Sequence, residues 1–274
     1  MKKYFVIGNP ISHSLSPRLH NYWIKKNDLE ATYDKKKLNS KDLKTFILKI
    51  KNKQIDGANV TVPFKKEVIP YLDKLTIEAK TTQSVNTILL TEGKLTGHNT
   101  DIIGFEEAIR DLDFDFFGKK VLILGSGGVV SSIIFALYKM KVLSVTISNR
   151  TKSKAVNLQN FFNSNLFEKN EREKIIVVDW GEIPEFDIVI NATSIGLKKN
   201  QKIDLDFTKV AKDKLFYDVI YNPKETNFLK MGKKLGHRAE NGKKMFIFQA
   251  AEAFKIWNDI QPEINQEVLN LLDD

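Results

Sequence analysis

The sequence contains no cysteine. Disulfide bonds, thiol chemistry and metal sites built on cysteine are therefore excluded. Histidine is also rare, and the four residues are scattered along the chain: His13, His20, His98 and His237. Because they form no pattern of closely spaced ligands, we expect no bound metal.

Long hydrophobic runs are absent as well. No apolar stretch approaches the ~20 residues that a membrane-spanning helix needs. The apolar stretch Tyr4–Gly8 is too short for a signal peptide and lacks a small-residue cleavage site, so it is interpreted as a first strand. With 274 residues, 42% hydrophobic and 28% charged, the chain has the composition of a soluble globular protein of one large or two ordinary domains. We expect a cytoplasmic protein with no membrane partner.

Arginine is scarce, since it supplies only five of the 43 basic residues. The net charge of +9 raises the question of a nucleic-acid partner. However, the lysines are spread along the whole chain beside Asp and Glu, and no aromatic residues interleave with a basic stripe. We therefore attribute the charge to a lysine-rich composition and expect no nucleic-acid partner, although positive charge attracts anionic ligands.

A glycine-rich turn is the most informative segment that is present. It follows the apolar strand Val121–Leu124 and precedes an apolar helix over 133–138. The turn consists of Gly125, Ser126, Gly127, Gly128 and Val129. Glycine lets the backbone approach a pyrophosphate, which binds to the unpaired N–H groups at the start of the helix. This order of strand, turn and helix predicts a dinucleotide-binding domain.

The end of the next strand, Ser144–Ser148, indicates which dinucleotide is bound. NAD enzymes usually place an acidic residue there to bind the ribose 2′-hydroxyl, and this chain has none. Arg150 and Lys154 offer cations instead, while Asn149 and Thr151 offer hydrogen bonds. Cations with hydrogen-bonding neighbours suit a 2′-phosphate, so we predict NADP as the cofactor.

Strands and helices alternate along the chain in two series. Strands are expected at Tyr4–Gly8, Ala31–Asp34, Gly57–Thr61, Ser84–Leu90, Val121–Leu124, Ser144–Ser148, Lys174–Val178, Asp187–Ala192 and Leu215–Tyr221. Helices are expected at Pro17–Lys26, Lys41–Lys51, Lys66–Tyr71, Gly104–Leu112, Phe246–Ile256 and Glu263–Leu272. This alternation predicts an α/β protein with mostly parallel sheets and two domains. We expect the last two helices to pack on the first domain.

Polar residues follow several of the early strands, and each has an ordinary structural explanation. Ser16 precedes Pro17 at a helix start, so its spacing alone favours helix capping. Lys65, just past Pro63, is explained equally well as a surface lysine. Asp101 precedes a helix and can serve as its N-cap.

The motifs together resemble the shikimate dehydrogenase family from the first strand to the last pair of helices. Nine segments match in order: Gly8–Pro17, Asn59–Lys65, Ser84–Thr87, Gly97–Gly104, Gly125–Gly128, Asn149–Thr151, Asn191–Gly196, Tyr217–Pro223 and Gln249–Ala251. The resemblance implies a substrate-binding and catalytic α/β domain at residues 1–101, completed by the helices at 243–274. It also implies a Rossmann-type, doubly wound NADP-binding domain at residues 102–242, with the active site in the cleft.

The resemblance assigns roles to individual residues. Lys65 and Asp101 match the catalytic pair, and Ser14 and Ser16 match serines that bind the substrate carboxylate. The substrate-binding set implied by the family is Ser14, Ser16, Thr61, Lys65, Asn86, Asp101, Tyr221 and Gln249. The cofactor-binding set is Gly125, Ser126, Gly127, Gly128, Val129, Asn149, Arg150, Thr151, Lys154, Asn191, Thr193 and Gly242. Lys243 and Lys244 depart from the family, which commonly has small residues there.

The implied reaction is the reversible reduction of 3-dehydroshikimate to shikimate by NADPH, a step of aromatic amino acid and chorismate biosynthesis. A lysine ammonium can stabilise charge on the ketone oxygen and donate the proton, while a carboxylate keeps the lysine oriented. Two alternatives stay open: an NAD-preferring quinate/shikimate dehydrogenase, and an NADP-binding sensor without catalysis. The partner is a small-molecule substrate, and the chain is expected to be a monomer or a homodimer.

Overall fold

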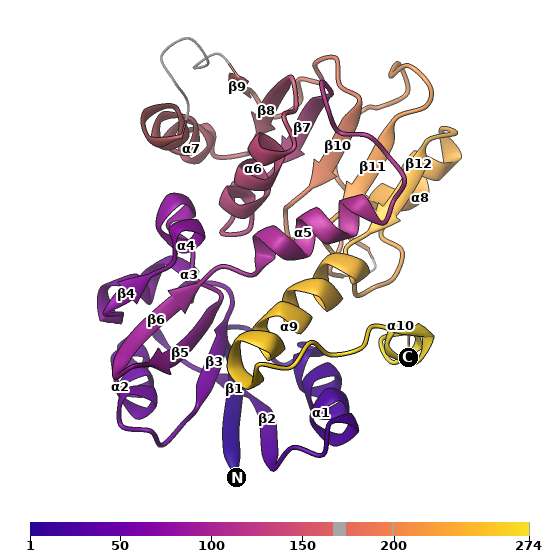
Figure 1. Cartoon of the computed structure of the whole chain (residues 1–274). Coiled ribbons are helices and arrows are strands. Elements are labelled where there is room, and N and C mark those ends of the chain that lie inside the picture. The colour runs from indigo at the N-terminus through magenta and orange to yellow at the C-terminus, as the bar shows by residue number, and fades with distance from the viewer. Residues whose placement is uncertain (167–173, 199, 274) are drawn as a thin grey trace. The chain divides into compact units, whose positions relative to one another are not determined.

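The computed structural model describes residues 1–166, 174–198 and 200–273. The chain divides into two compact units. The first unit contains Met1–Phe105 and Ile247–Asp274, and the second contains Glu106–Phe246. Each unit is built on one six-stranded sheet with helices packed against it (Figure 1).

The first unit has a mixed sheet with the strand order β2-β1-β3-β5-β6-β4. Its strands are β1 (Lys2–Gly8), β2 (Ala31–Lys37), β3 (Gly57–Val60), β4 (Lys74–Leu75), β5 (Thr87–Thr91) and β6 (Lys94–His98). Its helices are α1 (Ser16–Lys26), α2 (Ser40–Lys51), α3 (Phe64–Glu67), η1 (Ile69–Tyr71), α4 (Ile77–Thr82), α10 (Gln266–Asn270), the start of α5 (Asp101–Arg110) and most of α9 (Lys243–Asn258).

The sheet of this unit is parallel where β1 pairs with β2 and β3 and where β4 pairs with β6, as expected, but β5 runs antiparallel to both β3 and β6. The sequence analysis expected no strand over residues 94–98 and so missed β6. A two-residue turn at Glu92 and Gly93, with φ of 51° and 75°, joins β5 to β6. Tight hairpin turns of this kind need positive φ at both positions, and Gly93 was the available signal.

The second unit has a wholly parallel sheet with the strand order β12-β11-β10-β7-β8-β9. Its strands are β7 (Lys120–Leu124), β8 (Ser144–Ser148), β9 (Ile175–Val178), β10 (Ile188–Asn191), β11 (Leu215–Asp218) and β12 (Arg238–Asn241). Its helices include α6 (Val130–Lys139), α7 (Lys152–Asn165) and α8 (Asn227–Lys234). The chain runs from β7 toward one edge of the sheet and then from β10 toward the other, which is the doubly wound order of a Rossmann fold. The predicted α/β class and Rossmann-type half are therefore confirmed.

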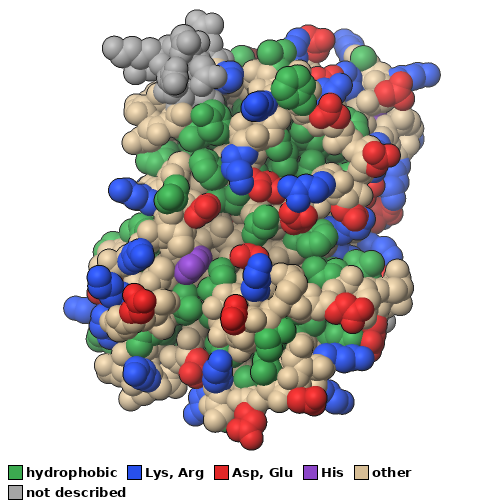
Figure 2. Space-filling model, in the orientation of Figure 1, with side chains coloured by type: hydrophobic (Ala, Val, Ile, Leu, Met, Phe, Trp, Pro, Cys, Tyr) green, Lys and Arg blue, Asp and Glu red, His purple; other side chains and the backbone are tan. Residues whose placement is uncertain are grey.

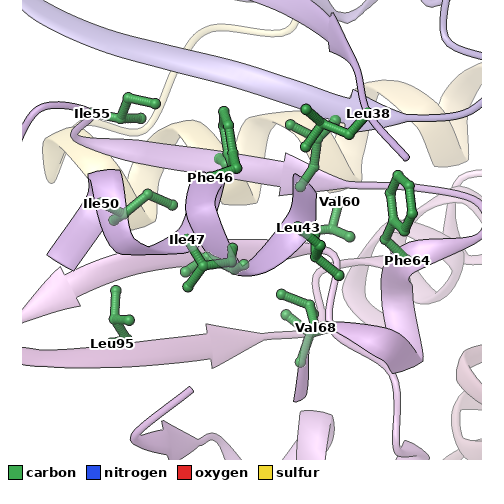
Figure 3. Close-up of a cluster of buried hydrophobic side chains, with 14 of the residues drawn as sticks. Leu38, Leu43, Phe46, Ile47, Ile50, Ile55, Val60, Phe64, Val68 and Leu95 are labelled. Carbon is green, nitrogen blue, oxygen red and sulfur yellow. The ribbon is translucent and has the colours of Figure 1, made fainter. Parts of the chain in front are cut away.

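The core of the first unit forms where α2 packs on the sheet. Leu43, Phe46, Ile47 and Ile50 recur at helical spacing and are at most 3% exposed. Figure 3 shows these side chains gathered with others, among them Val60 of β3, Leu95 of β6 and Phe64 of α3. Burying this apolar stripe holds α2 against the sheet and keeps the strand ends in place.

The C-terminal part of α9 packs within the first unit through Trp257. Its indole N–H donates to the carbonyl of Ile88 at 3.2 Å, and its ring stacks on Tyr4 with centroids 4.7 Å apart. Gly57 leaves room for the indole, because a Cβ there would lie 2.5 Å from its nitrogen. Helix α9 is thereby joined to β1, β3 and β5.

Charges are mixed on the surface. Over the described part of the face in Figure 2, Lys and Arg side chains are interspersed with Asp and Glu. Among the described residues, no helix combines the length and the apolar character that crossing a membrane requires.

His20 is buried in an aromatic group of the first unit. Its ring lies parallel to the Tyr33 ring, with centroids 4.1 Å apart, and also contacts Trp23 and Trp257. Neither ring nitrogen has a hydrogen-bond partner among the described residues. Burial lowers the pKa of His20 to about 3, so the folded protein holds a neutral imidazole.

This burial predicts a pH-dependent stability. Between pH 6.5 and about 3, the unfolded chain binds a proton at His20 that the folded protein does not bind, so the free energy of unfolding falls as the pH falls. Phenylalanine keeps a ring but cannot be protonated. Relative to His20→Phe, we expect the wild-type protein to lose about 2 kcal/mol between about pH 7.5 and about pH 5. Urea unfolding of both proteins at the two pH values measures this. If the difference in the free energy of unfolding between the two proteins is the same at both pH values, the prediction is contradicted.

Candidate active site

Four polar segments of the first unit lie at the same end of its strands, where β1, β3 and β6 finish. Strands β1 and β3 are parallel neighbours, and the Thr61 N–H donates to the Ile7 carbonyl at 2.9 Å just beyond them. Because β5 is antiparallel to β3, it begins at this end of the sheet, where Thr87 lies opposite Asn59. Strand β6 ends opposite Thr87 at His98. The segments carrying Ser14 and Ser16, Thr61 and Lys65, Asn86, and Asp101 therefore converge.

Lys65 and Asp101 form a buried ion pair. The Lys65 ammonium contacts Oδ2 of Asp101, and the two side chains are 12% and 8% exposed. Lys65 lies on the single turn α3, which follows Pro63, and Asp101 is the first residue of α5. The surface-lysine interpretation is wrong, because only 12% of the Lys65 side chain is exposed and its ammonium is paired with Asp101. Asp101 is not the N-cap of α5, because the helix already includes it.

Asn86 connects this ion pair to the strands. Its Nδ2 donates to Oδ1 of Asp101 at 2.9 Å, and its Oδ1 accepts from the Thr100 backbone N–H at 2.8 Å. Its Nδ2 also lies 3.5 Å from Oε1 of Gln249, on α9. Four predicted substrate-binding residues, Lys65, Asn86, Asp101 and Gln249, are thus brought into one hydrogen-bonded group.

The two predicted carboxylate-binding serines contact each other. The Ser14 hydroxyl donates to Oγ of Ser16 at 3.2 Å and accepts from the Ser16 backbone N–H at 3.3 Å. Helix α1 includes Ser16, and its N-cap position is Leu15, which makes no side-chain cap. The capping explanation of Ser16 is therefore wrong. Tyr221, by contrast, belongs to the second unit, where its ring stacks on Phe246 with centroids 4.1 Å apart.

The glycine turn of the second unit lies where the strand order reverses. Gly125 follows β7, donates its N–H to the Ser148 carbonyl at 2.8 Å and has a φ of 110°. A Cβ on Gly125 would lie 2.9 Å from the carbonyl oxygen of Ala192, next to β10, so both conformation and space require glycine. A Cβ on Gly127 would come no nearer than 3.9 Å to Ala192. The protein leaves open space beside Gly127, as close approach of a pyrophosphate requires.

Exposed cations follow β8. Arg150 and Lys154 are exposed, and among the described residues neither has an ion-pair partner. Lys152, between them, is paired with Asp179 at 2.9 Å. The first turn of α7 has no acidic residue. The Asn149 amide donates to the Thr151 carbonyl at 2.8 Å and shapes the turn that carries Arg150. Two unpaired cations at this position suit a ribose 2′-phosphate.

Asn191, at the end of β10, is fully buried and organises the neighbouring turn. Its Oδ1 accepts from the backbone N–H of Thr193 at 3.1 Å and from its hydroxyl at 2.7 Å. Its Nδ2 donates to the Ile195 carbonyl and to Oδ1 of Asp218, both at 3.1 Å. Asn191 and Thr193, two of the predicted cofactor-binding residues, therefore share one hydrogen-bonded turn.

Asp218 is a buried acid that the sequence analysis did not single out. It accepts hydrogen bonds from Asn191, from the Thr226 hydroxyl at 2.6 Å and from the Ile220 N–H at 3.0 Å. Burial raises the pKa of Asp218 to about 6, although these donors oppose the rise. A lone acid in the apolar stretch 215–220 was the available signal.

Gly242 packs against the backbone of Val219, the residue that follows Asp218. A Cβ there would lie 2.2 Å from the carbonyl oxygen of Val219, so only glycine fits. Lys244, one of the departures from the family, forms an ion pair with Asp111.

Across the described residues, no group of three or more His, Asp or Glu side chains is placed to hold a metal ion.

The fold and these two groups of residues define a class of α/β dehydrogenases. One unit has the Rossmann order, an open glycine turn and the exposed cations Arg150 and Lys154, which suit a phosphorylated dinucleotide. The other presents a lysine–carboxylate pair among amide and hydroxyl groups that suit a polyhydroxylated substrate.

Comparison with known proteins identifies the family. Residues 6–88 match the family model "Shikimate dehydrogenase substrate binding domain", and residues 106–224 match "Shikimate / quinate 5-dehydrogenase". A shikimate dehydrogenase (NADP(+)) of Pelagibacter ubique is 52% identical over 274 residues, covering 100% of both chains. The chain belongs to the shikimate dehydrogenase family.

Two solved structures show the same fold. The shikimate dehydrogenase of Aquifex aeolicus has a TM-score of 0.88 and 36% identity, covering 100% of this chain and 98% of the other. The shikimate 5-dehydrogenase of Thermus thermophilus, in complex with NADP(H) and shikimate, has a TM-score of 0.86 and 28% identity over 100% of this chain and 98% of the other.

Proposed function

We propose that this chain is an NADP-dependent shikimate dehydrogenase that interconverts 3-dehydroshikimate and shikimate. The observation that carries the proposal is the largely buried Lys65–Asp101 pair, which is joined through Asn86 to Gln249 at the ends of the strands. The relative from Pelagibacter ubique, named as the NADP(+) enzyme and similar over the whole chain, supports the same activity. A cytoplasmic location and a monomeric or homodimeric state stay predictions.

The residues of the second unit fit the cofactor. The open space beside Gly127 suits the pyrophosphate, and the unpaired Arg150 and Lys154 suit the 2′-phosphate. Neither alternative function is favoured. Arg150 and Lys154, together with the absence of an acidic residue in the first turn of α7, argue against NAD preference, and the intact Lys65–Asp101 pair argues against a sensor without catalysis.

The first unit performs the proton chemistry. NADPH, when bound to the second unit, would supply the hydride for the ketone carbon. Nζ of Lys65 lies against the ketone oxygen, stabilises the charge that develops there and gives it a proton. Asp101 holds the ammonium in place and accepts a hydrogen bond from a ring hydroxyl. Ser14 and Ser16 bind the substrate carboxylate through their hydroxyls.

Initial-rate measurements test the proposal directly. Shikimate and quinate are each offered with NADP⁺ and with NAD⁺. We expect the highest kcat/KM for shikimate with NADP⁺. A preference for NAD⁺ would favour the quinate/shikimate alternative, whereas NADPH binding without turnover of either substrate would favour the sensor.

Arg150→Ala tests the cofactor site. Losing a charge-assisted contact to a phosphate removes about 1.5–3 kcal/mol of binding, so we expect the KM for NADP⁺ to rise about 10- to 100-fold. The KM for NAD⁺ should change little, because NAD⁺ has no 2′-phosphate. Lys152→Ala is the matched control, since Lys152 is already paired with Asp179. Equal losses for both cofactors would show that Arg150 acts structurally.

Lys65→Met tests the catalytic pair. Methionine keeps much of the apolar stem but removes the ammonium, which acts mainly in the transition state, so kcat should fall about 10²-fold or more. Lys66→Met is the control, because Lys66 is the exposed neighbour on the same turn. Thermal unfolding of both variants verifies folding.

Asp101→Asn, alone and combined with Lys65→Met, tests whether the two residues act together. We expect Asp101→Asn also to lower kcat, and the combined loss to be smaller than the product of the separate losses. Strictly multiplicative losses, or a Lys65→Met enzyme with normal kcat, would contradict the pairing.

A further inference from the structure

A chain of buried hydrogen bonds leads from the edge of the first sheet to the Lys65–Asp101 pair. Tyr33, on the edge strand β2, donates its hydroxyl to Oδ1 of Asn59 at 2.6 Å. Asn59 Nδ2 donates to Oγ1 of Thr87 at 3.0 Å, and the Thr87 hydroxyl donates to Oδ1 of Asn86 at 3.1 Å. Asn86 then donates to Asp101.

Backbone groups fix the orientation of both amides in this chain. Asn59 Nδ2 faces the Asn86 carbonyl oxygen at 3.1 Å, which can only accept, so the Asn59 oxygen must face Tyr33. The Asn86 oxygen faces the Thr100 N–H, which can only donate, so the Asn86 amino group must face Asp101. Every hydrogen bond in the chain therefore has one direction.

Tyr33, at the far end of the chain, is itself held from two sides. The Asn21 side chain donates to the Tyr33 carbonyl at 2.7 Å and accepts from the Tyr33 N–H at 2.9 Å. The Tyr33 ring lies parallel to the His20 ring, with an angle of 2° between them. Both the backbone and the ring of Tyr33 thus have fixed positions from which the hydroxyl reaches Asn59.

Stability alone is a weak explanation for this arrangement. Tyr33, Asn59, Asn86 and Thr87 are at most 7% exposed. Burying polar groups gains little over packing apolar side chains of the same volume, whereas a fully satisfied network gives a unique geometry. Proton transfer depends on such geometry, because a small displacement of a catalytic group lowers the rate strongly.

We propose that Tyr33, Asn59 and Thr87 are positioning residues that fix the Asn86 amide and, through it, the Asp101 carboxylate and the Lys65 ammonium. This inference rests on the proposed dehydrogenase function. None of the three residues needs to touch the substrate for the role. Their contribution is the fixed direction of the Asn86 amino group.

Thr87→Val and Thr87→Ser form the main test. Valine keeps the shape of threonine but removes the hydroxyl, and serine keeps the hydroxyl but removes the methyl group. We expect Thr87→Val to lower kcat/KM for shikimate about 3- to 10-fold, a modest loss because Thr100 still holds the Asn86 oxygen. The KM for NADP⁺ should stay within about two-fold, since the glycine turn and cations lie in the other unit. Thr87→Ser should restore most of the activity.

Thr96→Val is the matched control, because Thr96 is a buried threonine of the same sheet whose hydroxyl, within the described part of the chain, bonds only to the nearby Lys94 carbonyl. Its activity should match wild type. The proposal is wrong if Thr87→Val behaves like Thr96→Val, or if Thr87→Ser is as impaired as Thr87→Val. Wild-type enzyme inactive on shikimate would contradict the proposed function, whereas active wild type with an unaffected Thr87→Val would contradict only this inference.

Tyr33→Phe provides a second test that keeps the ring stacked on His20. We expect a loss of kcat/KM in the same direction, with the KM for NADP⁺ unchanged. In the double variant with Thr87→Val, the combined loss should be smaller than the product of the separate losses, because both changes interrupt the same chain. Multiplicative losses, or full activity of Tyr33→Phe, would contradict the proposal.

Discussion

The buried ion pair of Lys65 and Asp101 is the constraint on which the first unit's polar arrangement depends. Removing two charges from water is expensive, and their attraction offsets this only when the remaining hydrogen-bonding capacity is satisfied. Asn86 satisfies the second oxygen of Asp101, and Thr100 and Thr87 satisfy Asn86 in turn. Each buried polar group needs a further hydrogen-bond partner, so one ion pair requires polar residues on several strands of an otherwise apolar core.

The second unit handles its cations in the opposite way. Arg150 and Lys154 are exposed and have no ion-pair partner among the described residues, although Lys152 between them is paired with Asp179. An exposed cation remains well hydrated and carries little desolvation penalty, so it can remain unpaired until an anion arrives. A pre-formed ion pair at Arg150 would have to break before a phosphate could bind. Catalysis thus uses a fixed cation, and cofactor recognition uses available ones.

Local sequence signals predicted the parts of the structure that depend on local physics. The glycine turn, the buried parallel strands and the strand–helix alternation follow from short-range conformational rules, and the predicted Rossmann fold is confirmed. Sequence reasoning missed β6, whose turn at Glu92 and Gly93 was a local but overlooked signal. It did not find the link from Tyr33 to Asn59, 26 residues apart, and only the family resemblance placed Asn86 and Gln249, 163 residues apart, in one site. Such pairings depend on strand order and register, which no local pattern specifies.

Asp101 and Asp218 show what different partners do for a buried carboxylate. Asp101 faces an ammonium, whereas the donors to Asp218 in the described structure are all neutral: the Asn191 amide, the Thr226 hydroxyl and a backbone N–H. Neutral donors fix the position of a carboxylate but do not compensate fully for its desolvation, which is why the pKa of Asp218 is raised to about 6. Asp218 holds the chain around it through hydrogen bonds. That role depends on the positions of the donors and acceptor, so neutral donors are sufficient. Orienting a lysine requires a charge opposite the ammonium, and the Asn86 amide is aimed so that Asp101 supplies it.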